Sequence, residues 1–189
     1  SEASLNNYHY KPLADDALLE KYHEGIVATS GCLGSAVNKA LMAGDFKEAM
    51  DIAGRHREIF GVDNYFIEIQ NHGIPDQLRI LGDQVELAKK MGIPLLATQD
   101  SHYGKREDAE MHEAILAMQT GAKLSDETRF KFESDENYMR TAEEMYELFP
   151  DSEFPGACSN TLLIEERARE IKSDFTGANQ AYLIPTFPT

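Results

Sequence analysis

Apolar and polar positions along the chain follow two different patterns, and these predict alternating strands and helices. Short segments rich in Ile, Leu, Val and aromatic residues are typical of strands and occur at residues 25–29, 65–70 and 93–98. Segments with apolar residues at helical spacing are expected to be helices, at residues 17–22, 35–43, 46–60, 76–91, 106–119, 142–149 and 160–171. Strands separated by helices predict parallel pairing, because parallel strands need crossover connections.

Residues at the ends of these segments agree with the predicted boundaries. Asp45 can cap helix 46–60, and Gly92 can end helix 76–91. Thr141 and Glu144 match a capping box that opens the helix after them. Residues 123–137 are charged and polar, which predicts a loop with one brief strand. The final residues, 182–189, contain two prolines and no partner for their apolar side chains, so we expect the chain to continue into another domain.

The composition narrows the class of protein. A length of 189 residues is enough for one domain with a core, and 42% hydrophobic with 27% charged residues is ordinary for a globular protein. No apolar run approaches the roughly 20 residues that span a bilayer, and residues 1–10 lack the pattern of a secretory signal. Cys32 and Cys158 form no CxxC pair. We therefore expect no disulfide framework, no membrane partner and a reduced, cytoplasmic setting.

The charge is strongly acidic, with 33 acidic against 18 basic residues and a formal net charge of −15. Such a surface repels the phosphate backbone of a nucleic acid, so this chain is a poor candidate for the main nucleic-acid-binding surface. A local metal-bearing site on an acidic body remains compatible with this charge.

The most distinctive chemistry follows the apolar segment 93–98, where Asp100 and His102 stand one residue apart. Residues i and i+2 of a strand point to the same face, so a carboxylate and an imidazole can converge there on one cation. Ligands of parallel α/β folds bind at the carboxyl ends of strands. The other two expected strands present Cys32, and Glu68 with His72, at that edge. Thiolate, carboxylate and imidazole together make a plausible set of zinc ligands.

Each of these residues also has a purely structural interpretation. Asp100 could accept a hydrogen bond at a turn beside a surface histidine. Cys32 could be a small buried hydrophobe, as free cysteines often are. His72 could cap a turn beside a glycine, and Glu68 could belong to the polar face of its strand. The remaining histidines are expected to be structural or exposed: His9, His23, His56 and His112.

Taken in order, long segments of the chain resemble the PHP domain of bacterial DNA polymerase III alpha subunits. They read KYHEGIVATSGCLGS at residues 21–35, DNYFIEIQNHG at 63–73 and PLLATQDSHYGKREDAEMHEAILAMQTG at 94–121. Later segments, RFKF at 129–132, EMYELFP at 144–150 and NTLLIEER at 160–167, resemble the stretch that joins this domain to the polymerase core.

The resemblance implies an α/β fold, a partial distorted (β/α)7 barrel with parallel strands, followed by a mostly helical extension. Residues 1–121 would be the carboxyl-terminal part of the PHP domain, and residues 122–189 a connector toward the polymerase palm. It also implies a site of up to three divalent metals, zinc or manganese. By position, the metal ligands would be Cys32, Asp100 and His102. Residues beside the metals or the substrate would be Glu68, His72, Tyr103 and Arg106.

The chain departs from the family pattern near its beginning. Residues 1–24 contain no H-x-H pair, since His9 stands alone between two tyrosines. The resemblance therefore implies a fragment whose metal site is incomplete, and whose magnesium-dependent polymerase site lies outside this sequence. We expect neither DNA synthesis nor exonuclease activity from this polypeptide by itself.

For the parent protein, the resemblance implies DNA-directed DNA synthesis and a metal-dependent 3′–5′ proofreading exonuclease in the PHP domain. Its partners would be DNA, the sliding clamp and other replisome subunits. An inactive PHP scaffold that binds the polymerase core or a separate exonuclease is the alternative, and a free-standing PHP phosphoesterase is a further one. A partial barrel exposes strand edges and apolar surface, so self-association of the fragment is also expected.

Overall fold

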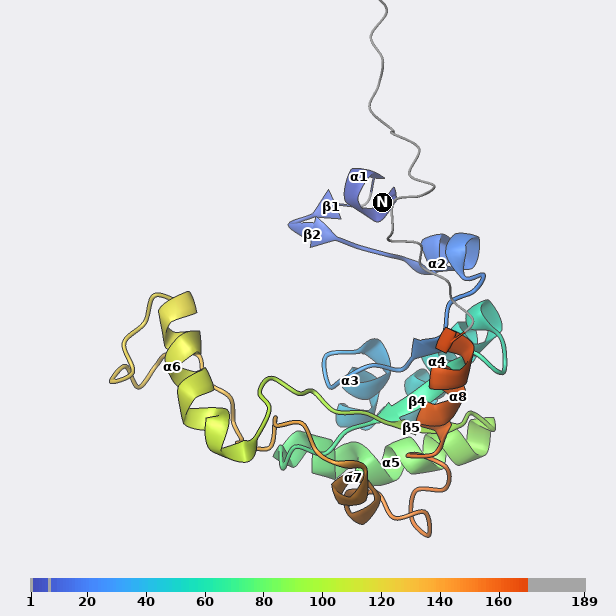
Figure 1. The fold of residues 1–189 in the computed structure, drawn as a ribbon. Helices are drawn as coiled ribbons and strands as arrows, with labels where there is room; N and C mark the ends of the chain where they lie inside the picture. Colours follow the sequence, from blue (N-terminus) through green and yellow to red (C-terminus); the bar gives the residue numbers. More distant parts are fainter. Residues whose placement is uncertain (1, 7, 170–189) are drawn as a thin grey trace, which may run out of the picture.

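The computed structural model describes residues 2–6 and 8–169 of the chain (Figure 1). A small amino-terminal unit and a larger α/β body follow one another along the sequence. The elements in chain order are α1 (Glu2–Asn6), β1 (Tyr8–His9), β2 (Lys11–Pro12), α2 (Asp16–Tyr22), β3 (Ala28–Thr29), α3 (Ala36–Met42), α4 (Phe46–Phe60), β4 (Tyr65–Ile69), α5 (Pro75–Met91), β5 (Leu95–Ala97), the 3-10 helix η1 (Arg106–Asp108), α6 (Ala109–Gln119), α7 (Ala142–Leu148) and α8 (Asn160–Arg169).

The centre of the body is a parallel sheet of three strands in the order β3-β4-β5. Ala28 aligns with Tyr65, and Ile67 aligns with Leu95. The expected parallel pairing is confirmed, although β3 and β5 are shorter than the apolar segments suggested. On the outer side of β5, the Ala97 amide donates to the Ala157 carbonyl over 2.8 Å, and the Asn160 side chain donates to the Leu95 carbonyl, also over 2.8 Å. The segment before α8 thus covers this edge of the sheet.

The core lies between the sheet and helices α3, α4 and α5, which contact one another, while α8 contacts β5. The central strand β4 is buried at every position except Glu68, which is partly exposed. Fully burying a Leu, Ile or Phe side chain contributes about 1.5–3 kcal/mol, so this cluster supplies most of the driving force for folding. Its most enclosed members are Val37, Ala49, Ala53, Tyr65, Ile67, Ile69, Ile80, Leu87, Phe149 and Ala157.

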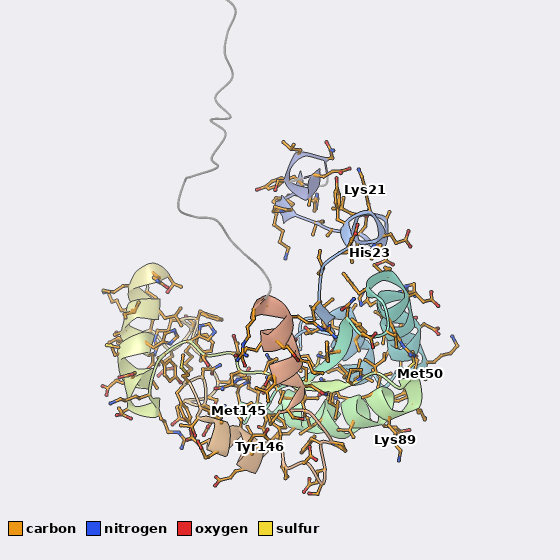
Figure 2. The ribbon with its side chains drawn as sticks, turned by 45° about the vertical axis from the view of Figure 1, so that its right-hand side comes forward. Lys21, His23, Met50, Lys89, Met145 and Tyr146 are labelled. Atoms are coloured by element: carbon orange, nitrogen blue, oxygen red, sulfur yellow. The ribbon has the colours of Figure 1, made fainter. Side chains whose placement is uncertain are left out.

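Several predicted helix boundaries are confirmed by their capping contacts. The Glu48 amide donates to Asp45 Oδ1 over 2.9 Å at the start of α4. Gly92 ends α5 in the left-handed conformation with φ 61°. Both bonds of the capping box at α7 form, since Thr141 and Glu144 each accept from the other's backbone amide. This helix turns Met145 into the core, while the next residue, Tyr146, remains exposed (Figure 2).

Other expectations were wrong or incomplete. The hairpin of β1 and β2, and the short helix α1, were not anticipated, because residues 2–12 carry no apolar periodicity. The hairpin reverses at Tyr10, which has φ 59°. The single helix expected over 106–119 is divided into η1 and α6, and the Asp108 carboxylate accepts the Lys105 amide at the start of η1. Residues 123–137 form no strand, and the nearest pairing is an isolated bridge between Tyr103 and Tyr138.

The periphery of the molecule is extended. Helix α6 projects away from the sheet, and the amino-terminal hairpin stands apart from the body (Figure 1). Helix α8 is described as far as Arg169, so the last two residues of the expected helix 160–171 and the proline-containing tail lie outside the described residues. Among the described helices, none combines the length and apolar character that crossing a bilayer requires.

Candidate metal centre

Asp100 and His102 lie together just beyond the carboxyl end of β5, as their spacing predicted. Asp100 Oδ1 is 3.2 Å from His102 Nε2, a contact that becomes an ion pair when the imidazole is protonated. Both side chains reach solvent, since that of Asp100 is 57% exposed and that of His102 is 37% exposed. The two residues meet although neither belongs to a regular strand, so the backbone after β5 must hold them in place.

His72 lies beneath this segment and is 1% exposed. Its Nε2 atom accepts the backbone amide of Asp100 over 3.0 Å, and its own amide donates to Gln77 Oε1 over 2.8 Å. Burial lowers the pKa of His72, and the positive charge of Arg140 lowers it further. Because the lone pair of Nε2 is occupied by the Asp100 amide, this nitrogen does not face the candidate metal position.

Asn137 contacts the same segment from the other side and is 2% exposed. Its side-chain Nδ2 donates to the Asp100 carbonyl over 3.0 Å, and its backbone carbonyl accepts the His102 amide over 2.8 Å. Its Oδ1 is buried and has no hydrogen-bond partner in the described part of the chain. The sequence analysis missed this residue, because it stands in a polar stretch without periodicity or a recognisable motif.

Glu68 connects the three parallel segments of the sheet. Its carboxylate accepts hydrogen bonds from the hydroxyl of Thr29 in β3 and from Thr98 Oγ1 after β5, the latter over 2.5 Å. Gln70 Nε2 donates to the same carboxylate over 3.1 Å. This carboxylate is therefore engaged by protein donors and bridges the sheet on the side where the strands end.

Cys32 follows β3 and is exposed, so the interpretation as a buried hydrophobe does not hold. It lines a small cavity together with Glu68, Asn38 and Gln84. Cys32 follows the end of β3, whereas Asp100 and His102 follow the end of β5, and β4 lies between these two strands. In the part of the chain that the structure describes, Cys32, Asp100 and His102 are not gathered into one group that could hold a metal ion.

The donors present do not make a complete metal site. Within residues 2–6 and 8–169, no group of three or more His, Cys, Asp and Glu side chains is arranged to hold a metal ion. Asp100 and His102 supply two donors, whereas catalytic zinc sites typically use three protein ligands. The described residues thus fit part of a metal centre.

The remaining candidates surround the pair with aromatic and charged groups. The ring centroid of His102 lies 4.6 Å from that of Phe132 and 5.6 Å from that of His112. The Tyr103 hydroxyl accepts the Asn137 amide over 3.3 Å. Arg106 forms an ion pair with Glu136, outside the Asp100–His102 contact. The structure therefore places Tyr103 beside the segment that holds the pair, and Arg106 at its margin.

The amino-terminal part of the chain matches a family model described as the PHP domain, over residues 1–72. Together with the parallel α/β sheet and the polar residues at its carboxyl edge, this defines the class: an α/β protein with part of a PHP barrel, as the resemblance implied.

The wider comparison covers most of the chain. It is 43% identical over 167 residues to the DNA polymerase III subunit alpha of Saccharopolyspora erythraea, a match that spans 88% of this chain and 14% of the relative. Identity is 47% over 154 residues with the subunit of Deinococcus radiodurans, covering 82% of this chain and 12% of that one. Identity with the DNA polymerase III subunit alpha of Thermus aquaticus is 37% over 190 residues, covering 100% of this chain and 15% of that one. The chain belongs to the family of DNA polymerase III alpha subunits, and it corresponds to about one seventh of their length.

Proposed function

We propose that this chain is part of the alpha subunit of a replicative polymerase that synthesises DNA from a DNA template. The observation that carries the proposal is the continuous match, at 37–47% identity, to alpha subunits over most of the chain. DNA, a sliding clamp and other replisome subunits are then the partners of the parent protein in the cytoplasm. The acidic surface of this segment agrees with a supporting position away from the main DNA contact.

We further propose the division into a PHP portion, residues 1–121, and a connector toward the palm, residues 122–189. The match to the PHP model over residues 1–72 supports the first portion. The two portions share one core in the described residues, because Phe149 and Ala157 join the buried cluster of α3, α4 and α5. The connector therefore stabilises the PHP portion by packing against it, in addition to extending the chain.

Asp100 and His102 would hold a divalent cation, zinc or manganese, in the parent protein, with Cys32 as the third ligand of the same centre. The convergence of the carboxylate and the imidazole supports this assignment. The parent would use this centre for 3′–5′ exonuclease proofreading, and magnesium in a separate polymerase site. Because the described donors are incomplete, this chain alone would bind zinc or manganese weakly and have no exonuclease activity.

Calorimetric titration of the purified chain with ZnCl2 and with MnCl2 tests this proposal. We expect weak binding that Asp100→Asn reduces further, and no cleavage of a 3′-labelled mismatched primer. Asp83→Asn, at an exposed position of α5, serves as the matched control, and Cys32→Ala tests the third candidate ligand. Tight stoichiometric zinc binding that Cys32→Ala abolishes would show that the thiolate completes the site.

An inactive PHP scaffold is the second candidate function. Two observations favour it: the Glu68 carboxylate is engaged by two threonine hydroxyls, and the Asp100 backbone is held by buried side chains. Such residues would then serve packing and support the polymerase core or a separate exonuclease. The parent gene separates the two candidates, since an upstream H-x-H pair is expected for a metal centre and substituted ligands for a scaffold. A free-standing phosphoesterase fits less well, because the relatives are about seven times longer than the matched region.

Self-association of the isolated chain is a separate proposal. Only one edge of β3 is paired in the described part of the sheet, where its neighbour is β4. An unpaired edge offers backbone donors and acceptors to another chain. Sedimentation velocity at several concentrations tests this, with a concentration-dependent dimer as the expected result. A monomer at all concentrations would contradict it.

A further inference from the structure

The backbone of Asp100 is bound at both of its polar groups by buried side chains from distant parts of the sequence. Its amide donates to His72 Nε2 over 3.0 Å, and its carbonyl accepts from Asn137 Nδ2 over 3.0 Å. His72 comes shortly after β4, and Asn137 comes from the segment before α7. We propose that His72 and Asn137 are positioning residues, which hold the Asp100–His102 segment in the conformation where its carboxylate and imidazole meet.

The chemistry of the two contacts is complementary. A backbone amide is an obligatory donor, so the His72 nitrogen that accepts it must be unprotonated, and this fixes the orientation of the ring. Gln77 holds the backbone of the same residue, since its Oε1 accepts the His72 amide over 2.8 Å. A side chain that is 1% exposed and contacted in this way has little freedom to follow a moving loop.

The segment around Asn137 contacts the Asp100–His102 segment from the other side, and we call His72 and Asn137 together the clamp. The Asn137 carbonyl accepts the His102 amide, and the Met139 amide donates to the Tyr103 carbonyl over 3.1 Å. Next to them, Gln99 exchanges two side-chain hydrogen bonds with the backbone of Arg140, over 2.7 and 3.2 Å. The segment from Gln99 to Tyr103 is thus bound on one side by His72 and on the other by residues 137–140.

The segment needs such external support. It lies outside β5 and before η1, so neither a strand nor a helix determines its backbone. The Asp100 side chain is 57% exposed, so its own burial does not hold it either. The supporting side chains are the buried ones, and the chemically reactive ones face solvent. This arrangement is expected where a pair of donors is oriented in advance for a ligand.

This inference deepens the proposed function, because a cation at Asp100 and His102 would benefit from their fixed orientation. The clamp can nevertheless be measured without any cation. NMR can detect scalar coupling across the N–H···N hydrogen bond from the Asp100 amide to His72 Nε2 in the unaltered chain. We expect this coupling to be present, and its absence would overturn the proposal without requiring any variant to fold.

Amide hydrogen exchange of the metal-free chain gives the second test. His72→Ala is expected to speed exchange at the Asp100 amide at least tenfold, and His72→Gln to restore most of the protection, because the glutamine carbonyl can accept the same amide. Asn137→Ala should speed exchange at Asp100 and His102. Asn71→Ala is the matched control, since its side chain contacts the Gly73 amide and not Asp100. Unchanged Asp100 exchange in His72→Ala, or failure of His72→Gln to rescue it, would contradict a positioning role.

A third measurement separates the clamp from the proposed metal function. Addition of Mn²⁺ is expected to broaden the His102 ring signals in the unaltered chain and in His72→Gln, and to broaden them less in His72→Ala. If coupling and exchange behave as expected and Mn²⁺ has no effect at His102 in the unaltered chain, the clamp stands and the proposed metal function fails. Equal broadening in all three proteins would show that the clamp does not orient the pair for a cation.

Discussion

Glu68 offers the sharpest test of how the carboxyl edge of the sheet is stabilised. Its carboxylate accepts hydroxyl hydrogen bonds from Thr29 and Thr98, and Gln70 adds an amide donor. Thr29 and Thr98 stand 39 and 30 residues from Glu68 in the sequence, one before β4 and one after it. Gln70 comes directly after β4. Replacing the carboxylate therefore removes one acceptor shared by the three parallel segments.

The expected loss of stability on replacing Glu68 follows from these contacts. A hydrogen bond to a charged group contributes about 1.5–3 kcal/mol, and the partly exposed position of Glu68 favours the lower end. Glu68→Ala removes both hydroxyl bonds and should lower the free energy of unfolding by about 3 kcal/mol. Glu68→Gln keeps one acceptor oxygen, and the threonine hydroxyls can reverse their roles, so its cost should be about 1 kcal/mol.

Urea unfolding provides the assay, followed by far-ultraviolet circular dichroism and by tyrosine fluorescence, since the chain has 8 tyrosines and no tryptophan. Thr98→Val removes the hydroxyl at nearly constant shape, which allows a double-mutant cycle with Glu68→Ala. We expect a coupling energy of about 1–1.5 kcal/mol with unchanged m-values. Additivity within about 0.5 kcal/mol would show that the carboxylate does not bridge the segments, and would refute the reasoning.

Three further changes test the core, a helix cap and a partly buried histidine. Leu87→Ala, at a fully buried position of α5, should lower the free energy of unfolding by about 2–5 kcal/mol. Leu78→Ala, on the exposed side of the same helix, should change it by less than about 0.5 kcal/mol. Equal effects of the two substitutions would contradict the assigned core. Thr141→Ala should lower the free energy of unfolding by about 1 kcal/mol, because it removes the N-cap of α7. Thr141→Ser keeps the hydroxyl and should retain most of that stability. No difference in stability between the two variants would argue against the cap. Burial lowers the pKa of His56 below its usual 6.5, so as the pH falls the unfolded chain takes up the proton before the folded chain does. The free energy of unfolding should therefore decrease below about pH 6.5, by at most about 1.4 kcal/mol per pH unit. His56→Gln should make the dependence of the unfolding free energy on pH shallower over that range, and an unchanged slope between pH 5 and 7 would count against a neutral, partly buried imidazole.

The regular part of the fold was accessible from the sequence because its signals are local. Helix α4 begins after the capping residue Asp45, and α5 ends at Gly92, both as predicted. The parallel order of the strands followed from the helices between them. The hairpin of β1 and β2 lacks such signals, because its strands are two residues long and fully exposed.

The candidate site was predictable only in part. The contact of Asp100 with His102 followed from their spacing, since residues so close in sequence are easily brought together. The support from Asn137 depends on hydrogen bonds between residues 37 positions apart, and no local pattern encodes such a contact. Cys32 follows β3 and the pair follows β5, and the structure does not gather the three side chains into one metal-binding group among the described residues. Chain periodicity predicts the strands but not which of their ends come within reach of one ion.

The reading frame of the parent gene tests the central claim most directly. If the chain is a segment of a DNA polymerase III alpha subunit with a remnant of its metal centre, sequencing outward from the codons for Ser1 and Thr189 should show a frame about seven times longer than the matched region. It should encode an H-x-H pair upstream and the acidic residues of a polymerase palm downstream. A frame that starts close to Ser1 and stops soon after Thr189 would contradict the account.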